Sequence, residues 1–215
     1  DPRFYKAEPI WVTAERQGVK SASFFWVGTE APIKRISPSM FKYYDGDIPF
    51  ETRVDSVISW FQLEEKTRPQ LILLYFSEPD HTGHEYGLNR EKIAESVSKM
   101  DSLLGYIHQK LKTLGIYSQL NIIITSDHGM TDVSADRLII LEDYISRLDE
   151  LYFNNSSSYV QFDHKKGTKD YSDLLLQELK KIPHSQVWEK SGIPERFHFV
   201  IGNTGDYLLL ADEGW

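Results

Sequence analysis

Residues 71–76 read Leu71-Ile-Leu-Leu-Tyr-Phe76, a continuous apolar run that lacks the alternation of a strand with one face in water. A second run of this kind, Asn121-Ile-Ile-Ile-Thr-Ser126, follows later in the chain. Such runs are typical of parallel strands that are buried on both faces. We therefore expect both runs to be central strands of one sheet.

Between the two runs, apolar residues recur at spacings of three and four, which predicts one long amphipathic helix. The stripe consists of Ile93, Val97, Met100, Leu104, Ile107, Leu111 and Leu114, and Gly115 is expected to end the helix. Upstream, we expect a strand over residues 20–26 and a helix marked by Phe50, Val54, Val57, Ile58 and Phe61. Strand, helix and strand in this order predict an α/β layer fold.

After Met130 the predicted elements are shorter: a polar turn at 154–158, a strand near 159–162, a helix over 170–182 and a strand at 207–211. A linker rich in Pro or Gly is absent between the two halves of the sequence. We therefore predict a single domain over residues 1–215. Residues 1–130 would form its α/β core, and residues 131–215 a smaller α+β lobe on the same sheet.

The overall composition excludes several classes of protein. The net charge of the chain is -8, so a basic face for binding a nucleic-acid duplex is not expected. Its apolar runs are far shorter than the roughly 20 residues that a membrane-spanning helix needs, which excludes a membrane span in this chain. Cysteine is absent. Any metal ion must therefore be held by His and carboxylate side chains.

Each apolar run is followed by an Asp and a His. The first run leads into Ser77-Glu-Pro-Asp-His-Thr-Gly-His84, and the second leads into Asp127-His-Gly-Met130. Ligands bind at the carboxyl ends of the strands in open α/β sheets. Asp80 and His84 are one helical turn apart and can converge on one ion. Asp127 and His128 can converge only if the chain turns off the strand there, a turn that Gly129 permits.

Two Asp/His pairs at neighbouring strand ends predict a two-metal centre. Oxygen and nitrogen ligands suit zinc, and two ions about 4 Å apart form a clamp for a phosphoryl group. The alternative is that each Asp begins a helix and each His is a hydrogen-bonded loop residue. This alternative is weaker for two pairs, each placed after a buried strand, than for one pair alone.

These motifs resemble those of the nucleotide pyrophosphatase/phosphodiesterases of the alkaline phosphatase superfamily. The resemblance also includes Glu8-Pro-Ile-Trp-Val-Thr13, Phe24-Phe-Trp-Val-Gly28 and Ala211-Asp-Glu-Gly-Trp215, so it extends over essentially the whole chain. It implies an alkaline phosphatase-like layered fold with a largely parallel central sheet. It also implies an enzyme that cleaves phosphodiester or pyrophosphate bonds in nucleotides.

The resemblance further implies two zinc ions in the intact enzyme. Asp80 and His84 would hold one ion in part, and Asp127 and His128 the other. The nucleophilic Thr and an Asp ligand would lie upstream of Asp1, and a last His ligand beyond Trp215. Each zinc site would then be incomplete here, so this chain, an internal fragment of the catalytic domain, should be inactive by itself.

Trp26 and Tyr44 match family positions that border or stack on the nucleobase, and Tyr75 resembles a pocket residue of the family. A flat aromatic face suits a base. For Tyr75, which belongs to a predicted strand, core packing is an equally good interpretation. Tyr44 lies in a polar turn and is harder to explain as a core residue.

Two alternatives to a nucleotide phosphodiesterase remain open. The first is a superfamily relative that acts on phospholipid head groups, phosphonates or phosphomonoesters. The second is a binding module without turnover. We expect an extracytoplasmic location, either periplasmic or as a secreted protein or ectodomain, whereas the sequence gives no indication of the oligomeric state.

Overall fold

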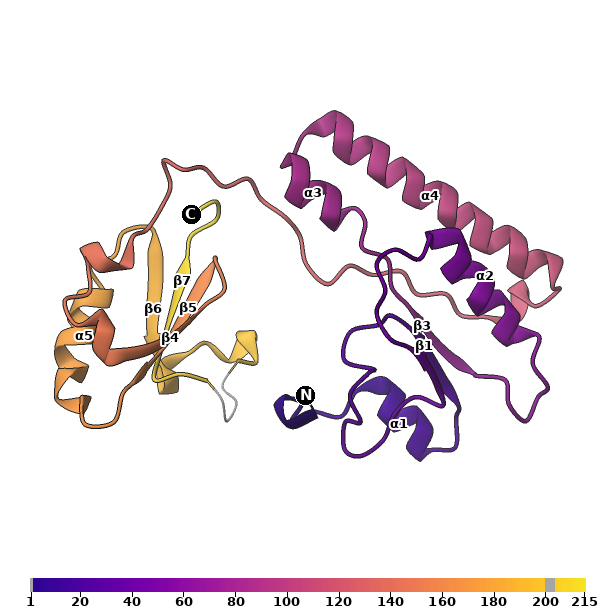
Figure 1. The fold of residues 1–215 in the computed structure, drawn as a ribbon, viewed down its shortest axis with the longest axis horizontal. Helices are drawn as coiled ribbons and strands as arrows, with labels where there is room; N and C mark the ends of the chain where they lie inside the picture. Colours follow the sequence, from indigo (N-terminus) through magenta and orange to yellow (C-terminus); the bar gives the residue numbers. More distant parts are fainter. Residues whose placement is uncertain (1, 200–203) are drawn as a thin grey trace. The chain divides into compact units, whose positions relative to one another are not determined.

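A computed structural model describes residues 2–199 and 204–215, and the chain forms two compact units. Unit 1 is Asp1–Met130 and unit 2 is Thr131–Trp215 (Figure 1). The elements of unit 1 are α1 (Ile10–Arg16), β1 (Ser21–Phe24), β2 (Met40–Lys42), α2 (Phe50–Phe61), β3 (Leu71–Leu74), α3 (Asp80–Tyr86) and α4 (Arg90–Thr113), with 3-10 turns at Pro2–Phe4 and Tyr117–Gln119.

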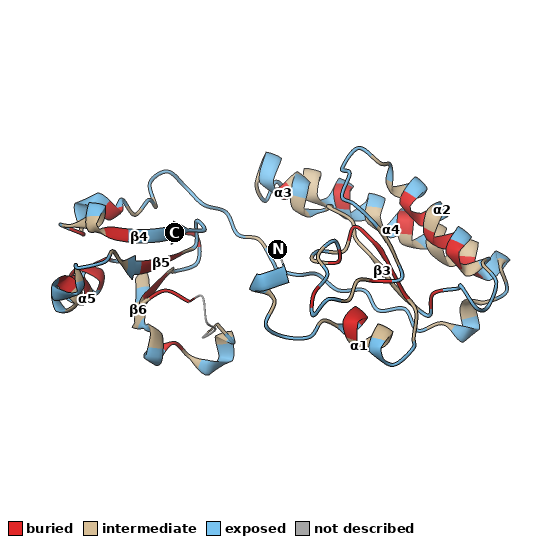
Figure 2. Ribbon diagram, turned by 60° about the horizontal axis from the view of Figure 1, so that its bottom comes forward, coloured by how far each residue is buried: buried red, intermediate tan, exposed pale blue. Residues whose placement is uncertain are grey.

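The sheet of unit 1 is parallel, with the strand order β2-β1-β3. Helices α1 and α2 lie on opposite faces of it (Figures 1 and 2). Successive residues of β3 point to these two faces: Leu73 packs against the cluster of Trp11 in α1, and Leu74 against the cluster of Trp60 in α2. A parallel sheet covered on both faces confirms the predicted α/β class.

Helices α2 and α4 pack on each other through their apolar stripes. Val54 and Ile58 of α2 form a buried cluster with Leu103 and Leu111 of α4, and Figure 2 shows the buried stripe of α2 in red. Both helices were predicted from their apolar spacing. Although α4 has 24 residues, no helix in the described part of the chain is both long and apolar enough to cross a membrane.

The prediction of a strand at 121–126 is wrong for this structure. These residues form no strand, and Ile123 is 87% exposed. A parallel strand exists only where a neighbouring strand pairs with it, and β3 is an edge strand of the described sheet. The segment 121–126 has the apolar residues of a buried strand, but it does not pair with a strand of the described sheet. The predicted βαβ unit is therefore not formed.

Unit 2 has its own antiparallel sheet, so the expectation that its strands extend the sheet of unit 1 is wrong. The strand order is β4-β5-β7-β6. Apolar residues of β5, β7 and α5 form one core that includes Phe162, Leu175, Leu179 and Leu209. The elements are β4 (Leu151–Asn155), β5 (Tyr159–His164), α5 (Ser172–Leu179), β6 (Ser185–Glu189) and β7 (Tyr207–Ala211), with 3-10 turns at Leu141–Asp143, Leu148–Glu150, Lys169–Tyr171, Lys190–Gly192 and Glu195–Phe197.

A buried carboxylate, Glu178, joins α5 to the segment before β4. It accepts hydrogen bonds from the hydroxyl of Tyr171 and from the backbone N–H of Ser146. Burial alone would raise the pKa of Glu178, but the hydrogen bonds from Tyr171 and Ser146 bring it below its ordinary value. This network has a structural role in unit 2, and the candidate functional residues lie in unit 1.

Candidate functional site

The first Asp/His pair stands on the short helix α3, which begins soon after β3 ends. Glu78 fixes the start of this helix: its Oε2 accepts from Thr82 N at 3.2 Å and Thr82 Oγ1 at 2.6 Å, and from Ser96 Oγ of α4 at 2.8 Å. Asp80 is the first residue of α3, and His84 lies one turn later. Their facing atoms, Asp80 Oδ1 and His84 Nε2, are 3.4 Å apart, as the spacing in the sequence predicts.

The second pair approaches the first. His128 Nε2 lies 3.7 Å from Asp80 Oδ1 and 3.8 Å from Asp127 Oδ2. The other ring nitrogen of His128, Nδ1, donates to the carbonyl of Gly129 at 2.7 Å, and this bond together with the charge of Asp127 raises the pKa of His128. The structure therefore brings Asp80, His84, Asp127 and His128 together, and we call them the Asp/His cluster.

Asp80 Oδ1 is the central atom of this cluster. It is buried and has no hydrogen-bond partner among the described residues. The Asp80 side chain is 39% exposed, whereas this one oxygen is buried, and a bound cation would satisfy it. Two imidazole nitrogens lie within 4 Å of it, at 3.4 Å and 3.7 Å, and His128 is oriented through its Nδ1 by a backbone carbonyl, as metal-binding histidines usually are.

The donor atoms of the Asp/His cluster, carboxylate oxygens and imidazole nitrogens, are of the types that zinc accepts. The cluster is not a finished coordination sphere, because within residues 2–199 and 204–215 no group of three or more His, Cys, Asp or Glu side chains is arranged to hold a metal ion. The side chain of His84 is 74% exposed and that of His128 is 55% exposed. These two imidazoles are therefore open to an incoming ligand, and the two-metal site stays a prediction.

Gly83 and Met130 join the two motifs by packing. Gly83 lies in α3 and is buried, and a Cβ added to it would overlap the Sδ of Met130. The last residue of the second motif thus rests on the helix that carries the first pair. A larger residue at position 83 would force the end of the Met130 side chain to move.

We expect Gly83→Ala to destabilise the chain by about 1–3 kcal/mol, because the added methyl group overpacks the contact with Met130. The measurement is the urea unfolding of the chain, with Gly105→Ala as the control. Gly105 has open space at its Cβ position and also lies inside a helix. Adding Met130→Ala to the Gly83 variant should recover most of the loss. No recovery in this double variant would show that the contact is not the cause.

One of the three predicted aromatic residues, Tyr75, lies within electrostatic reach of Asp80 and Asp127 in the Asp/His cluster. Tyr75 follows β3 and packs partly buried against the cluster of Phe24 and Phe25. Burial raises the pKa of Tyr75, and the nearby charges of Asp127 and Asp80 raise it further. Tyr44 is 56% exposed, and its ring centroid lies 5.3 Å from that of Phe25.

Trp26 lies differently. It is partly buried against the cluster of Trp11, Val12 and Ile33 on the α1 side of the sheet. Its carbonyl accepts from Thr29 Oγ1 at 2.6 Å. These are packing and backbone contacts, and a role in base binding stays a prediction for Trp26.

Three supporting residues were not predicted from the sequence: Glu30, Arg53 and Glu78. Glu30 Oε1 accepts from the backbone N–H of Tyr44 at 2.6 Å. Arg53 is fully buried at the start of α2. In the sequence, the burial of Arg53 is indicated only by its position. Arg53 lies three residues after Phe50 and places a charge within the apolar stripe of that helix. Glu30 and Glu78 look in the sequence like ordinary surface carboxylates.

Two small hollows lie in unit 2. One, of about 60 Å³, is lined by residues that include Leu141, Tyr159 and Leu209, and another, of about 170 Å³, by residues that include Tyr152 and Phe153. Pockets for drug-sized ligands usually measure about 300–1,000 Å³. These hollows carry no titratable cluster comparable to the Asp/His cluster of unit 1.

The profile of the family described as type I phosphodiesterase / nucleotide pyrophosphatase matches residues 1–215. Human ectonucleotide pyrophosphatase/phosphodiesterase family member 1 is 41% identical over 227 residues, which cover 100% of this chain. The venom phosphodiesterase CdcPDE of Crotalus durissus collilineatus is 32% identical over 223 residues, again with 100% coverage.

Solved structures agree with the sequence comparison. Murine ectonucleotide pyrophosphatase/phosphodiesterase 5 matches with a TM-score of 0.90 and 33% identity over 100% of this chain. An inactive variant of that murine protein in complex with AMP matches with the same TM-score of 0.90. The predicted fold is thereby confirmed. The chain spans 24% of the human relative, 27% of the venom enzyme and 57% of the solved murine chain.

Proposed function

We propose that this chain, which belongs to the type I phosphodiesterase / nucleotide pyrophosphatase family, is the part of a hydrolase that binds metal and nucleotide. The intact protein would cleave phosphodiester or pyrophosphate bonds in nucleotides. The observation that carries this proposal is the buried Asp80 Oδ1, which has no hydrogen-bond partner among the described residues and lies 3.4 Å and 3.7 Å from the Nε2 atoms of His84 and His128.

In this proposal Asp80 and His84 contribute to one zinc site, and Asp127 and His128 to another. The bound zinc would supply positive charge that stabilises the negative charge developing on the phosphoryl oxygens. Two further residues of this chain position these ligands, because Glu78 holds the start of α3 and Gly129 orients His128 through its carbonyl. The proposed nucleophile is a Thr that would precede Asp1 in the intact protein.

Nucleotides are the proposed substrates. The murine relative was solved with AMP, and the human relative is named for nucleotide pyrophosphatase activity. On this chain, Tyr44 presents an exposed aromatic face, and Tyr75 lies within electrostatic reach of Asp80 and Asp127. In this proposal the base stacks on Tyr44 and the phosphate binds at the Asp/His cluster.

An extracytoplasmic location is part of the proposal. The human relative is named an ectonucleotide enzyme, and the Crotalus relative is a venom enzyme. Other phosphoryl substrates, such as phospholipid head groups, phosphonates and phosphomonoesters, are the alternative for the same cluster. The exposed Tyr44 favours a base-containing substrate over these.

The test is hydrolysis by the full-length protein with zinc, using three p-nitrophenyl compounds that share one leaving group. We expect the ester of thymidine 5′-monophosphate to be cleaved with a higher kcat/KM than p-nitrophenylphosphocholine or p-nitrophenyl phosphate. Preference for the choline ester or for the monoester would replace the nucleotide assignment with one of the alternatives. No cleavage of any of the three by folded, zinc-loaded protein would favour a binding module.

A further inference from the structure

Arg53 is a fully buried cation in α2. Its guanidinium carbon lies 5.0 Å from the ring centroid of Phe25 and 4.7 Å from that of Phe50. Contacts of this kind between a cation and aromatic rings are favourable, but burying a charge is expensive unless hydrogen bonds also satisfy it. The burial of Arg53 is therefore explained by the groups that accept hydrogen bonds from its guanidinium.

These partners are backbone carbonyls of two separate segments. Nε donates to Ile48 O at 2.9 Å and Nη2 donates to Gly46 O at 3.2 Å, whereas Nη1 donates to Tyr75 O at 3.3 Å. The first two carbonyls belong to residues 43–48, which we call the aromatic loop. The third lies just beyond β3. A planar fork of fixed donors can join three carbonyls in this way, and a lysine ammonium cannot do so with the same geometry.

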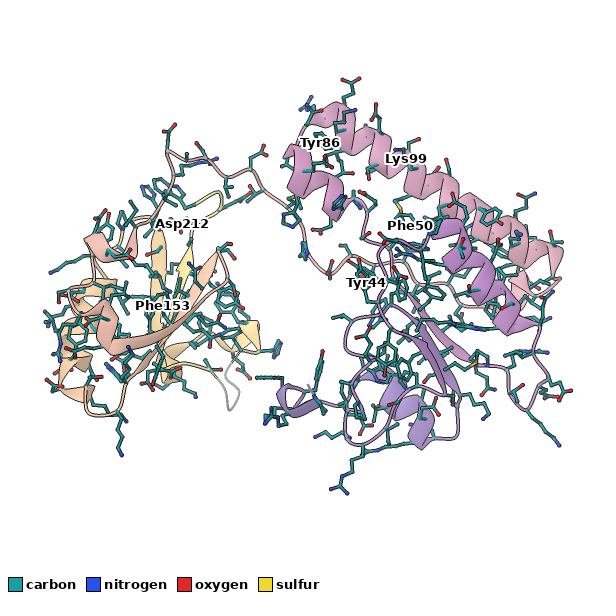
Figure 3. All side chains as sticks on the ribbon, viewed as in Figure 1. Tyr44, Phe50, Tyr86, Lys99, Phe153 and Asp212 are labelled. Carbon is teal, nitrogen blue, oxygen red and sulfur yellow. The ribbon has the colours of Figure 1, made fainter. Side chains whose placement is uncertain are left out.

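Apart from Arg53, the aromatic loop is held by the packing of Ile48 against the cluster of Phe24 and Trp60, by a ring contact between Tyr43 and Phe41, and by a few hydrogen bonds. Its own hydrogen bonds run from Asp47 N to Asp45 Oδ1 at 3.0 Å and from Ile48 N to Asp45 O at 3.4 Å. Tyr44 is held by Glu30 through its backbone N–H, and its ring contacts Phe25. Figure 3 labels Tyr44 of this loop and Phe50, the first residue of α2. Arg53 thus anchors the half of the loop that follows Tyr44.

We infer that Arg53 is a positioning residue for the nucleobase, because one guanidinium fixes the aromatic loop that carries Tyr44 to the backbone of Tyr75. This inference rests on the proposed function. The two tyrosines would then form a preformed surface, and a substrate with a base would not have to order the loop when it binds. A substrate without a base would gain nothing from this arrangement.

The test compares two substrates in the full-length protein: the p-nitrophenyl ester of thymidine 5′-monophosphate and methyl p-nitrophenyl phosphate, a phosphodiester with the same leaving group and a methyl group in place of the nucleoside. We expect Arg53→Met to lower kcat/KM for the nucleotide ester by about 5-fold or more, mainly through KM, because stacking of one base contributes about 1–3 kcal/mol. The value for the base-free ester should change by less than about 3-fold, since it uses no stacking. Arg53→Lys should give an intermediate loss.

The matched control is Val57→Ala, which lies one turn further along α2 in the core. It should lower the thermal midpoint without changing the ratio of kcat/KM between the two substrates. An unchanged ratio in Arg53→Met, or an equal change in Val57→Ala, would overturn the inference, because Arg53 would then act only through general stability.

A second measurement separates this inference from the proposed function. Amide hydrogen exchange of residues 43–48 should become faster in Arg53→Met than in Val57→Ala, since the loop loses two of its anchors. If the unmodified protein cleaves neither substrate, the proposed function fails, and the exchange rates still show whether Arg53 holds the loop. Equal exchange rates in the two variants would refute the positioning role.

Discussion

Asp80→Asn in the full-length, zinc-loaded protein should lower kcat/KM for a nucleotide ester by at least about 100-fold, since altering residues that merely orient metal ligands costs about 10–100-fold. The substitution keeps the shape of the side chain and removes its negative charge. Asp80 Oδ1 is the buried atom without a partner that faces both His84 and His128. If this oxygen binds metal, a neutral amide replaces a charged ligand at the centre of the site.

The measurements are steady-state hydrolysis, the zinc content of the purified variant and its thermal midpoint. Asp101→Asn is the matched control, because Asp101 is an exposed carboxylate on α4, and both its activity and its zinc content should equal those of the unmodified protein. An Asp80 variant that keeps full activity and full zinc content would remove Asp80 from the metal site. Loss of activity with a large drop in the thermal midpoint of the metal-free protein would instead assign a structural role.

The helices of unit 1 were predictable because their signals are local. Apolar residues at spacings of three and four define α2 and α4, and burial follows this pattern at Val54, Ile58, Leu103 and Leu111. The approach of Asp80 to His84 was also predictable, because one helical turn separates them and α3 is helical there. In each case the signal is a spacing of three or four residues within one helix.

Strand pairing was less predictable because it depends on distant partners. The runs at 71–76 and 121–126 look alike in the sequence, yet only the first pairs with β1. The separate sheet of unit 2 was missed for the same reason, since β5 and β7 pair although the whole of α5 and β6 lies between them in the sequence. Apolar composition indicates that a segment can be buried, but not which strand will lie beside it.

The supporting residues of the site depend on tertiary contacts as well. Glu78 is stabilised by Ser96, which is 18 residues away on another helix. Arg53 reaches Tyr75 across 22 residues. A carboxylate or a guanidinium that satisfies several distant backbone or hydroxyl groups has the same sequence signature as a solvated one. Only the folded structure shows which groups face it.

Zinc should raise the free energy of unfolding of the chain, by about 2.7 kcal/mol when free zinc is at a hundredfold excess over its dissociation constant. The reason is that the Asp/His cluster gathers these donors only in the folded state. Without a cation, the buried oxygen of Asp80 is unsatisfied, so binding removes an unfavourable feature of the fold. The measurement is urea unfolding of the chain at pH 7 with and without zinc.

The decisive comparison is between two double variants that each remove two histidines. In His84→Ala with His128→Ala the zinc effect should disappear, whereas it should persist in His81→Ala with His108→Ala, which lie outside the Asp/His cluster. Because His84 and His128 are more than half exposed, the first variant should lose less than about 1 kcal/mol without metal. A zinc effect that survives in it would mean that zinc binds elsewhere. A loss above about 3 kcal/mol without metal would mean that the two imidazoles stabilise the fold directly, since exposed side chains far from buried networks do not cost that much.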